Sequence, residues 1–191
     1  ARNTATGTNA SSNDTAIYIT AELRASGKYE VTRGFYNFDT SSIGAGQQID
    51  SGTFSLSHVG DSNGTDPHGL VQTSPISNTS ASVDDYDNLT LNSPNEGATR
   101  LSSFGAGYNN WSMNASGTSW INPLGVTNLG IRMAADIDNS TPSARSYRSW
   151  YAADQTGTAN DPKLVVEHSI PPASPLQGYS LRYAYDAAGN I

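Results

Sequence analysis

The apolar residues of this 191-residue chain alternate with polar residues in short segments, and clusters of Gly, Pro, Asn and Asp separate these segments. The clearest segment is 52–59, in which Phe54 and Leu56 stand two positions apart with serine between them. A period of two places the apolar side chains on one face of an extended strand, so the pattern predicts β-strands rather than helices. The predicted strands are residues 16–22, 29–38, 52–59, 68–73, 126–133, 143–152, 163–168 and 178–185.

The segments between the predicted strands are rich in turn-forming residues. Such clusters occupy residues 44–48, 61–67, 92–97, 136–142 and 155–162. Residues 106–123 differ, because two tryptophans stand among Gly, Asn and Ser, and they predict a long loop or a short helical turn at 118–121. Several strands separated by turn signals are typical of a β-sandwich or barrel, so we predict an all-β fold with long polar loops.

The composition limits the partners and the chemistry of the chain. The net charge of −7 at pH 7 argues against nucleic acid or an anionic membrane surface as a partner, because both need clustered Lys and Arg. The absence of Cys excludes disulfides, thiolate metal sites and thiol catalysis. No run of about 18 apolar residues exists, so no membrane span is predicted. The chain begins at Ala1 without a signal-peptide pattern, so a processed or excised fragment is expected.

Catalytic motifs are missing from the sequence. The three histidines, His58, His68 and His168, stand in none of the spacings that bind zinc. No Gly-x-Ser-x-Gly nucleophile motif occurs, and most acidic residues fall in turns rather than as a pair across a cleft. The protein is therefore predicted not to be an enzyme.

A structural Ca²⁺ ion is the one cofactor that the sequence suggests. Asp61, Asn63 and Asp66 place oxygen donors along a predicted turn, and Gly64 lets the chain reverse there. Calcium prefers such oxygen ligands, so these three residues are the candidate metal ligands. The alternative is an ordinary turn in which Asn and Asp bond to their own backbone.

Two stretches resemble the DNRLRE-type family of domains. Residues 33–43 read RGFYNFDTSSI, which resembles the family's R-x-x-x-x-F-D-x-S-x-I pattern, and the strand-like segment IDSGTFSL follows at 49–56. Residues 120–133 (WINPLGVTNLGIRM) and 161–168 (DPKLVVEH) resemble its closing segments. The resemblance implies a jelly-roll-type antiparallel β-sandwich that is secreted by bacteria or archaea and is not catalytic. Some members of that family bind acidic polysaccharides such as alginate.

A second resemblance lies near the end of the sequence, where residues 183–190 (YAYDAAGN) resemble the Y-x-Y-D-x-x-G-N signature of YD (RHS-type) repeats. It implies that the domain belongs to a longer YD-repeat surface protein. The chain is then divided into an N-terminal extension, a β-sandwich domain, a stiff Pro-rich linker and a YD-repeat-like segment. Their predicted bounds are 1–13, 14–169, 170–175 and 176–191.

Sugar binding is predicted from aromatic and basic residues. Tyr108 and Trp111 stand in the Gly/Asn-rich segment, where their rings could stack on the apolar face of a sugar. Arg100 or Arg145 could hold the carboxylate of an acidic sugar through two hydrogen bonds. These four residues are the candidate ligand-binding residues, although Trp111 could instead anchor the loop.

Two functions from different classes follow. The first is a non-catalytic, extracellular β-sandwich module of a large cell-surface protein that binds polysaccharide. The second is a structural subunit of a homopolymeric extracellular filament or adhesin. In the second case, copies would assemble by adding a terminal strand, from residues 1–14 or 176–191, to a neighbour's sheet.

Overall fold

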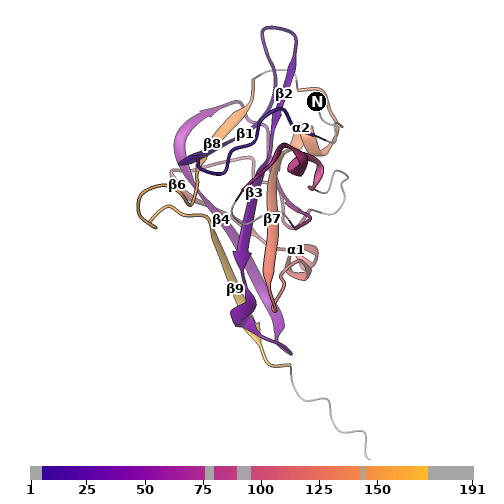
Figure 1. The fold of residues 1–191 in the computed structure, drawn as a ribbon, viewed down its shortest axis with the longest axis vertical. Helices are drawn as coiled ribbons and strands as arrows, with labels where there is room; N and C mark the ends of the chain where they lie inside the picture. The colour runs from indigo at the N-terminus through magenta and orange to yellow at the C-terminus, as the bar shows by residue number, and fades with distance from the viewer. Residues whose placement is uncertain (1–5, 76–79, 90–95, 143–144, 172–191) are drawn as a thin grey trace, which may run out of the picture.

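The computed structural model describes residues 6–75, 80–89, 96–142 and 145–171. Within these residues the chain forms two antiparallel sheets that pack face to face, which confirms the predicted all-β sandwich (Figure 1). The large sheet contains β2 (Tyr29–Thr32), β1 (Ala16–Leu23), β8 (Tyr147–Tyr151), β4 (Gln48–Asn63), β6 (Gly107–Ser112) and β9 (Lys163–Ser169). The small sheet contains β3 (Gly34–Asp39), β7 (Val126–Met133) and β5 (His68–Gln72). Four helical segments connect strands: η1 (Ser41–Ile43), η2 (Val83–Asp87), α1 (Ala115–Ser119) and α2 (Ala134–Ile137).

The long strand β4 organises the large sheet. Phe54 of β4 pairs with Trp111 of β6 and with Leu164 of β9, so β6 and β9 flank β4 on opposite sides. Farther along β4, His58 pairs with Trp150 of β8, and a bulge follows before Ser62. Strands β8 and β9 therefore lie on the same side of β4, one beyond the other, and only β8 is followed by a further strand, β1.

The core fills the space between the two sheets with aromatic and branched side chains. The ring of Trp111 lies 5.7 Å from Phe54 and 5.7 Å from Trp150, and Tyr36 of the small sheet lies 5.1 Å from Phe54. Edge-on and tilted ring pairs at this spacing add to the stabilisation from apolar burial. The period-two pattern predicted this inward face correctly at 52–59 and 126–133, because Phe54, Leu56, Leu129 and Ile131 are all buried.

The strand predicted over residues 29–38 is in fact two strands in different sheets. It breaks at Arg33, which is buried together with Arg132 and Asp136. Arg33 donates to Asp136 through Nε (2.8 Å) and Nη2 (2.9 Å), and Arg132 Nε donates to Asp136 Oδ2 (2.6 Å). The side chain of Arg33, between β2 and β3, is thus held inside the domain where the backbone crosses from the large sheet to the small sheet.

Residues 106–123 also differ from the prediction of a long loop. Residues 107–112 form β6, in which Asn109 bonds back to the carbonyl oxygens of Gly105 and Gly107. The short helical turn is confirmed in kind, but α1 lies at Ala115–Ser119, where the side chain of Asn114 accepts a hydrogen bond from the Gly117 N–H. Strand pairing with β4 overrode the weak strand propensity of Gly and Asn.

The remaining expectations divide into two groups. The strands predicted at 16–22, 52–59, 68–73, 126–133, 143–152 and 163–168 are confirmed as β1, β4, β5, β7, β8 and β9. The predicted strand 178–185, the YD-repeat-like segment and most of the Pro-rich linker lie outside the described residues. In the described part, no helix has the length and apolar character needed to cross a membrane.

Candidate functional site

Trp111 does not lie where a ligand could reach it. It is fully buried on the inner face of β6, and its Nε1–H donates to the carbonyl oxygen of His68 (3.1 Å). A side chain without exposed surface cannot touch a ligand at the surface, so Trp111 is a core residue, contrary to the prediction of a sugar-binding ring. Its ring instead supports the packing of Phe54 and Trp150.

Tyr108 lies on the outer face of the same strand, but other groups already occupy it. Its hydroxyl lies 2.9 Å from the carbonyl oxygens of both Ala159 and Asp161, which share its single proton. The Lys163 ammonium stands 3.7 Å above the ring centroid, in the position that a sugar ring would take. Tyr108 therefore fastens the β8–β9 connection to the large sheet.

Arg100 is neutralised by two carboxylates. Its Nε and Nη2 donate to Glu96, and its Nη1 and Nη2 donate to Asp138, over 2.5–2.9 Å. These hydrogen bonds, first to Asp138 and then to Glu96, raise the pKa of Arg100 above its ordinary value. A ligand carboxylate would have to displace one of the two acids, so Arg100 is a poor candidate for ligand binding.

Arg145 and Asp66 are brought together by the fold. Both line a pocket of about 400 Å³, whose wall includes Ala21 of β1 and Ala135 of α2. Pockets of about 300–1,000 Å³ are the usual size for small-molecule sites. The pocket wall also presents the hydroxyl-bearing residues Thr65, Ser140, Thr141 and Ser146.

The guanidinium of Arg145 has unused hydrogen-bonding capacity. Its Nε pairs with Oε2 of Glu22 (3.1 Å), a carboxylate that also pairs with Arg24. The Arg145 side chain is 56% exposed, and within the described part of the chain no group accepts a hydrogen bond from its two terminal nitrogens. A planar guanidinium with two free N–H-bearing nitrogens suits a carboxylate or a pair of hydroxyl oxygens.

Two tyrosine rings extend this site onto the outer face of the large sheet. The Arg145 guanidinium lies 4.4 Å from the ring centroid of Tyr147, and that ring lies 6.1 Å from the ring of Tyr18. Tyr147 pairs with Thr20 across β1 and β8, so Tyr147 and Tyr18 share one face. Their neighbours Ile19 and Trp150 point into the core, which fixes the tyrosines outward. We refer to Arg145, its pocket, Tyr147 and Tyr18 as the Arg145 site.

The sequence prediction missed Tyr18 and Tyr147. A signal for Tyr18 was present, because it stands between Ile17 and Ile19 in a period-two strand and so faces away from the core. Nothing in the sequence pairs Tyr18 with Tyr147, since 129 positions separate them and only the register of β1 against β8 joins them.

The three candidate calcium ligands have different environments. Asp61 and Asn63 belong to β4, which continues to Asn63 and so includes the first three residues of the predicted turn. Asn63 pairs with Tyr147 of β8. Asp66 accepts a hydrogen bond from the Ala135 N–H (3.1 Å), and its partial burial raises the pKa of its carboxyl. Among the residues that the structure describes, no three His, Cys, Asp or Glu side chains cluster in a way that could hold a metal ion.

The calcium site stays a prediction with a simple test. If Asp66 and its neighbours hold Ca²⁺, removal of the ion by a chelator should lower the melting temperature, because a ligand that binds only the folded state stabilises it. Scanning calorimetry with and without the chelator measures this. An equal melting temperature in excess calcium and in chelator would contradict the prediction.

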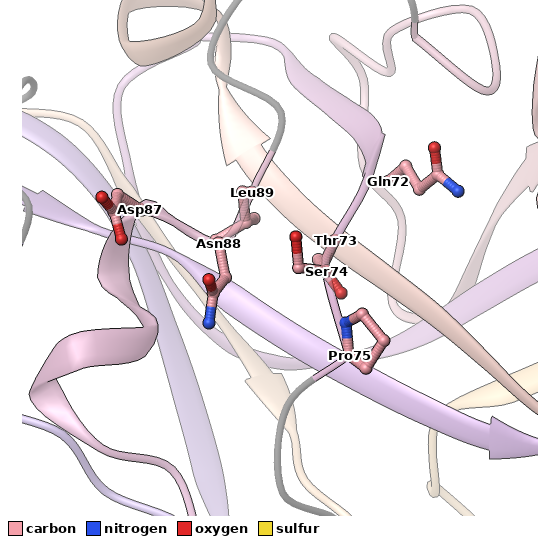
Figure 2. A pocket seen from close by; sticks show the side chains of 7 residues that line it. All are labelled: Gln72, Thr73, Ser74, Pro75, Asp87, Asn88 and Leu89. Carbon is pink, nitrogen blue, oxygen red and sulfur yellow. The ribbon is translucent and has the colours of Figure 1, made fainter.

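A larger recess of about 580 Å³ lies between the end of β5 and η2 (Figure 2). Residues 73–74 and 88–89 form its floor, since Thr73 bridges to Leu89 and the Ser74 N–H donates to the Asn88 carbonyl (2.7 Å). Figure 2 shows Gln72 directed away from Asp87. The described residues of the lining offer a carboxylate, amides and hydroxyls, and none of them is an aromatic residue or a cation, which the Arg145 site combines.

No protein-family model and no curated protein sequence matches this chain. The function is therefore inferred from the chemistry of the Arg145 site and from the β-sandwich that presents it.

Proposed function

We propose that this chain is a non-catalytic, extracellular β-sandwich module that binds a polysaccharide at the Arg145 site. The observation that carries the proposal is a half-exposed guanidinium over the ring of Tyr147, which in turn contacts the ring of Tyr18, next to a pocket lined by hydroxyl-bearing residues. The resemblance of residues 33–43 and 161–168 to DNRLRE-type domains supports the same class of protein.

The chemistry of the site matches that of a sugar chain. Pyranose rings present apolar faces that stack on tyrosine, and the ring of Tyr18, which is 46% exposed, offers such a surface. The Tyr147 ring links Tyr18 (6.1 Å) to the Arg145 guanidinium, which covers one face of the Tyr147 ring (4.4 Å). The terminal nitrogens of Arg145, which have no acceptor among the described residues, suit the carboxylate of a uronic acid, and the pocket hydroxyls suit the sugar's own hydroxyls. An acidic polysaccharide is therefore the favoured ligand class, bound locally in spite of the net charge of −7.

The proposal predicts a defined loss of binding in two variants. Replacing Arg145 by alanine should weaken binding of an acidic oligosaccharide about tenfold or more, because a charge-assisted hydrogen bond contributes about 1.5–3 kcal/mol. Tyr147→Ala should weaken it about three- to tenfold, because Arg145 and Tyr18 lose the ring that they pack against. Binding is first located on a panel of acidic and neutral polysaccharides and then measured by calorimetry for each variant.

Tyr18 has a closely matched control in the neighbouring strand. Tyr18 is 46% exposed and Tyr29 is 47% exposed, but Tyr29 pairs with Leu23 and so lies on the other face of the β1–β2 hairpin. Tyr18→Ala should weaken binding, and Tyr29→Ala should leave it unchanged. Equal losses in both variants would contradict the assigned face, and a wild-type chain that binds no polysaccharide on the panel would contradict the function.

A further inference from the structure

Strand β9 lies at an open edge of the large sheet. Among the described strands it pairs with β4 alone, over Gln48 to Ser55 of β4. Strand β8, which lies on the same side of β4, is covered by β1, but the pairing of β1 with β8 ends at Ala16 opposite Tyr151. In the described part of the chain, no strand pairs with the side of β9 that faces away from β4. The backbone N–H and C=O groups on that side therefore have no strand partner there.

This edge lacks most of the features that usually protect an edge strand. Natural edges tend to be very short, or carry a proline, a bulge or a charge in the middle of the strand. The seven residues of β9 have an apolar centre, Leu164 to Val166, with no proline and no bulge in it. Val165 is 56% exposed, more than any other large apolar side chain in a described strand. Such an edge is a template for a further strand.

The sequence after β9 contains a segment that suits this template. Residues 178–185 (GYSLRYAY) alternate apolar and polar residues, with Tyr179, Leu181, Tyr183 and Tyr185 on one face of an extended strand. The linker 170–175 carries three prolines, and a Pro-rich linker extends by about 3.1 Å per residue and resists bending. From this composition we expect the segment to reach a different molecule more readily than the β9 that immediately precedes it.

We propose that residues 178–185 of one copy of this chain add as a strand to the free edge of β9 in a second copy. Backbone hydrogen bonds supply most of the affinity, and the apolar face of the added strand covers the inner side of the edge near Leu164. Reciprocal exchange between two copies closes a dimer, whereas exchange in one direction builds an open chain of copies. The inference is independent of polysaccharide binding, because Tyr18 and Tyr147 lie on β1 and β8.

The absence of cysteine makes a disulfide test clean, because any introduced pair is the only one in the sample. A Val165→Cys variant of the full chain is mixed in turn with Ser180→Cys, Arg182→Cys and Ala184→Cys, each with a tag of a different mass. These three positions share one face of the added strand, the face expected beside Val165. After mild oxidation, we expect a covalent heterodimer with at least one of the three on a non-reducing gel.

The control replaces the acceptor position. Val83 is also an exposed apolar residue but lies on η2, away from β9, so Val83→Cys should give no heterodimer above background with the same partners. Equal yields with Val83→Cys and Val165→Cys would overturn the proposal. A double variant, Val165→Cys with Ala184→Cys, tests whether the contact is made within one chain. If it forms only an intramolecular disulfide at low concentration, exchange between copies would be overturned. Absence of a crosslink for all three positions would overturn the docking itself.

Discussion

Replacing Asp136 by alanine should lower the free energy of unfolding by about 3–5 kcal/mol, which is the usual cost of removing one partner from a buried ion pair. The Asp136 carboxylate is almost fully buried and accepts hydrogen bonds from two equally buried arginines, Arg33 and Arg132. Without it, two buried guanidinium groups would lose the carboxylate that they share. Chemical denaturation monitored by tryptophan fluorescence measures the change.

A nearby aspartate provides the control. Asp138 stands two residues further on, is exposed, and pairs with Arg100 at the surface. Surface pairs contribute about 0–1 kcal/mol, so Asp138→Ala should have a small effect. If the two alanine variants unfold at the same denaturant concentration, the buried network does not have the importance given to it here. Asp136→Ala should also weaken the packing of η2. Arg33 donates to the Tyr86 carbonyl oxygen and lies 4.0 Å from the centre of the Tyr86 ring, so displacement of Arg33 would disturb these contacts.

The pH dependence of Asp136 has a definite sign. Burial alone would raise the pKa of this carboxyl, but the hydrogen bonds from Arg33 and Arg132 outweigh it and hold the pKa below the ordinary value. A folded-state pKa below the unfolded one stabilises the fold at neutral pH. That stability is lost as the pH falls below about 4, where the unfolded carboxyl takes up a proton.

Because of His68, acidification should begin to destabilise the domain at a higher pH than the one at which Asp136 takes effect. The side chain is fully buried, with its ring centroid 4.9 Å from that of Phe104 and 5.8 Å from that of Trp150. Burial, with a smaller effect of Arg148, lowers the pKa of His68 to about 3. The fold therefore needs the neutral imidazole, whereas the unfolded chain takes up a proton near pH 6.5.

The stability from neutral His68 is complete above about pH 6.5 and falls as the pH decreases toward 3, by about 1.4 kcal/mol per pH unit. His68→Leu should remove this slope between pH 6 and 4, although its stability at pH 7 changes too. His168→Leu, at the exposed end of β9, should keep the slope. Unfolding free energies measured at several pH values give the slopes directly. Parallel profiles for the wild type and His68→Leu would contradict the assignment.

Local patterns in the sequence predicted the strands better than the site. Six of the predicted strands are present, and at 52–59 the alternation of apolar and polar residues predicted which side chains face the core. The break at Arg33 could not be predicted, because its partner Asp136 is 103 positions away. The prediction of Trp111 as a sugar-binding residue was wrong for a related reason. Its Gly- and Asn-rich neighbours suggest a loop, whereas its pairing with β4 places it in a strand with its side chain buried.

The same distinction explains the candidate site. Arg145 was predicted from its charge, and the structure leaves its terminal nitrogens without a partner among the described residues. Arg100 was predicted on the same ground, but Glu96 and Asp138 neutralise it. Charge alone does not distinguish the two arginines, since the difference depends on which carboxylates the fold brings beside them.

The pairing of β1 with β8 sets the order in which this chain can fold. Ala16 finds its partner Tyr151 only across most of the sequence, and until then β1 has only the hairpin with β2. An isolated two-stranded hairpin is marginally stable in water, and pairing at long sequence separation is slow. The large sheet therefore cannot be completed before residues 147–169 have been synthesised, because they supply two of its strands, β8 and β9.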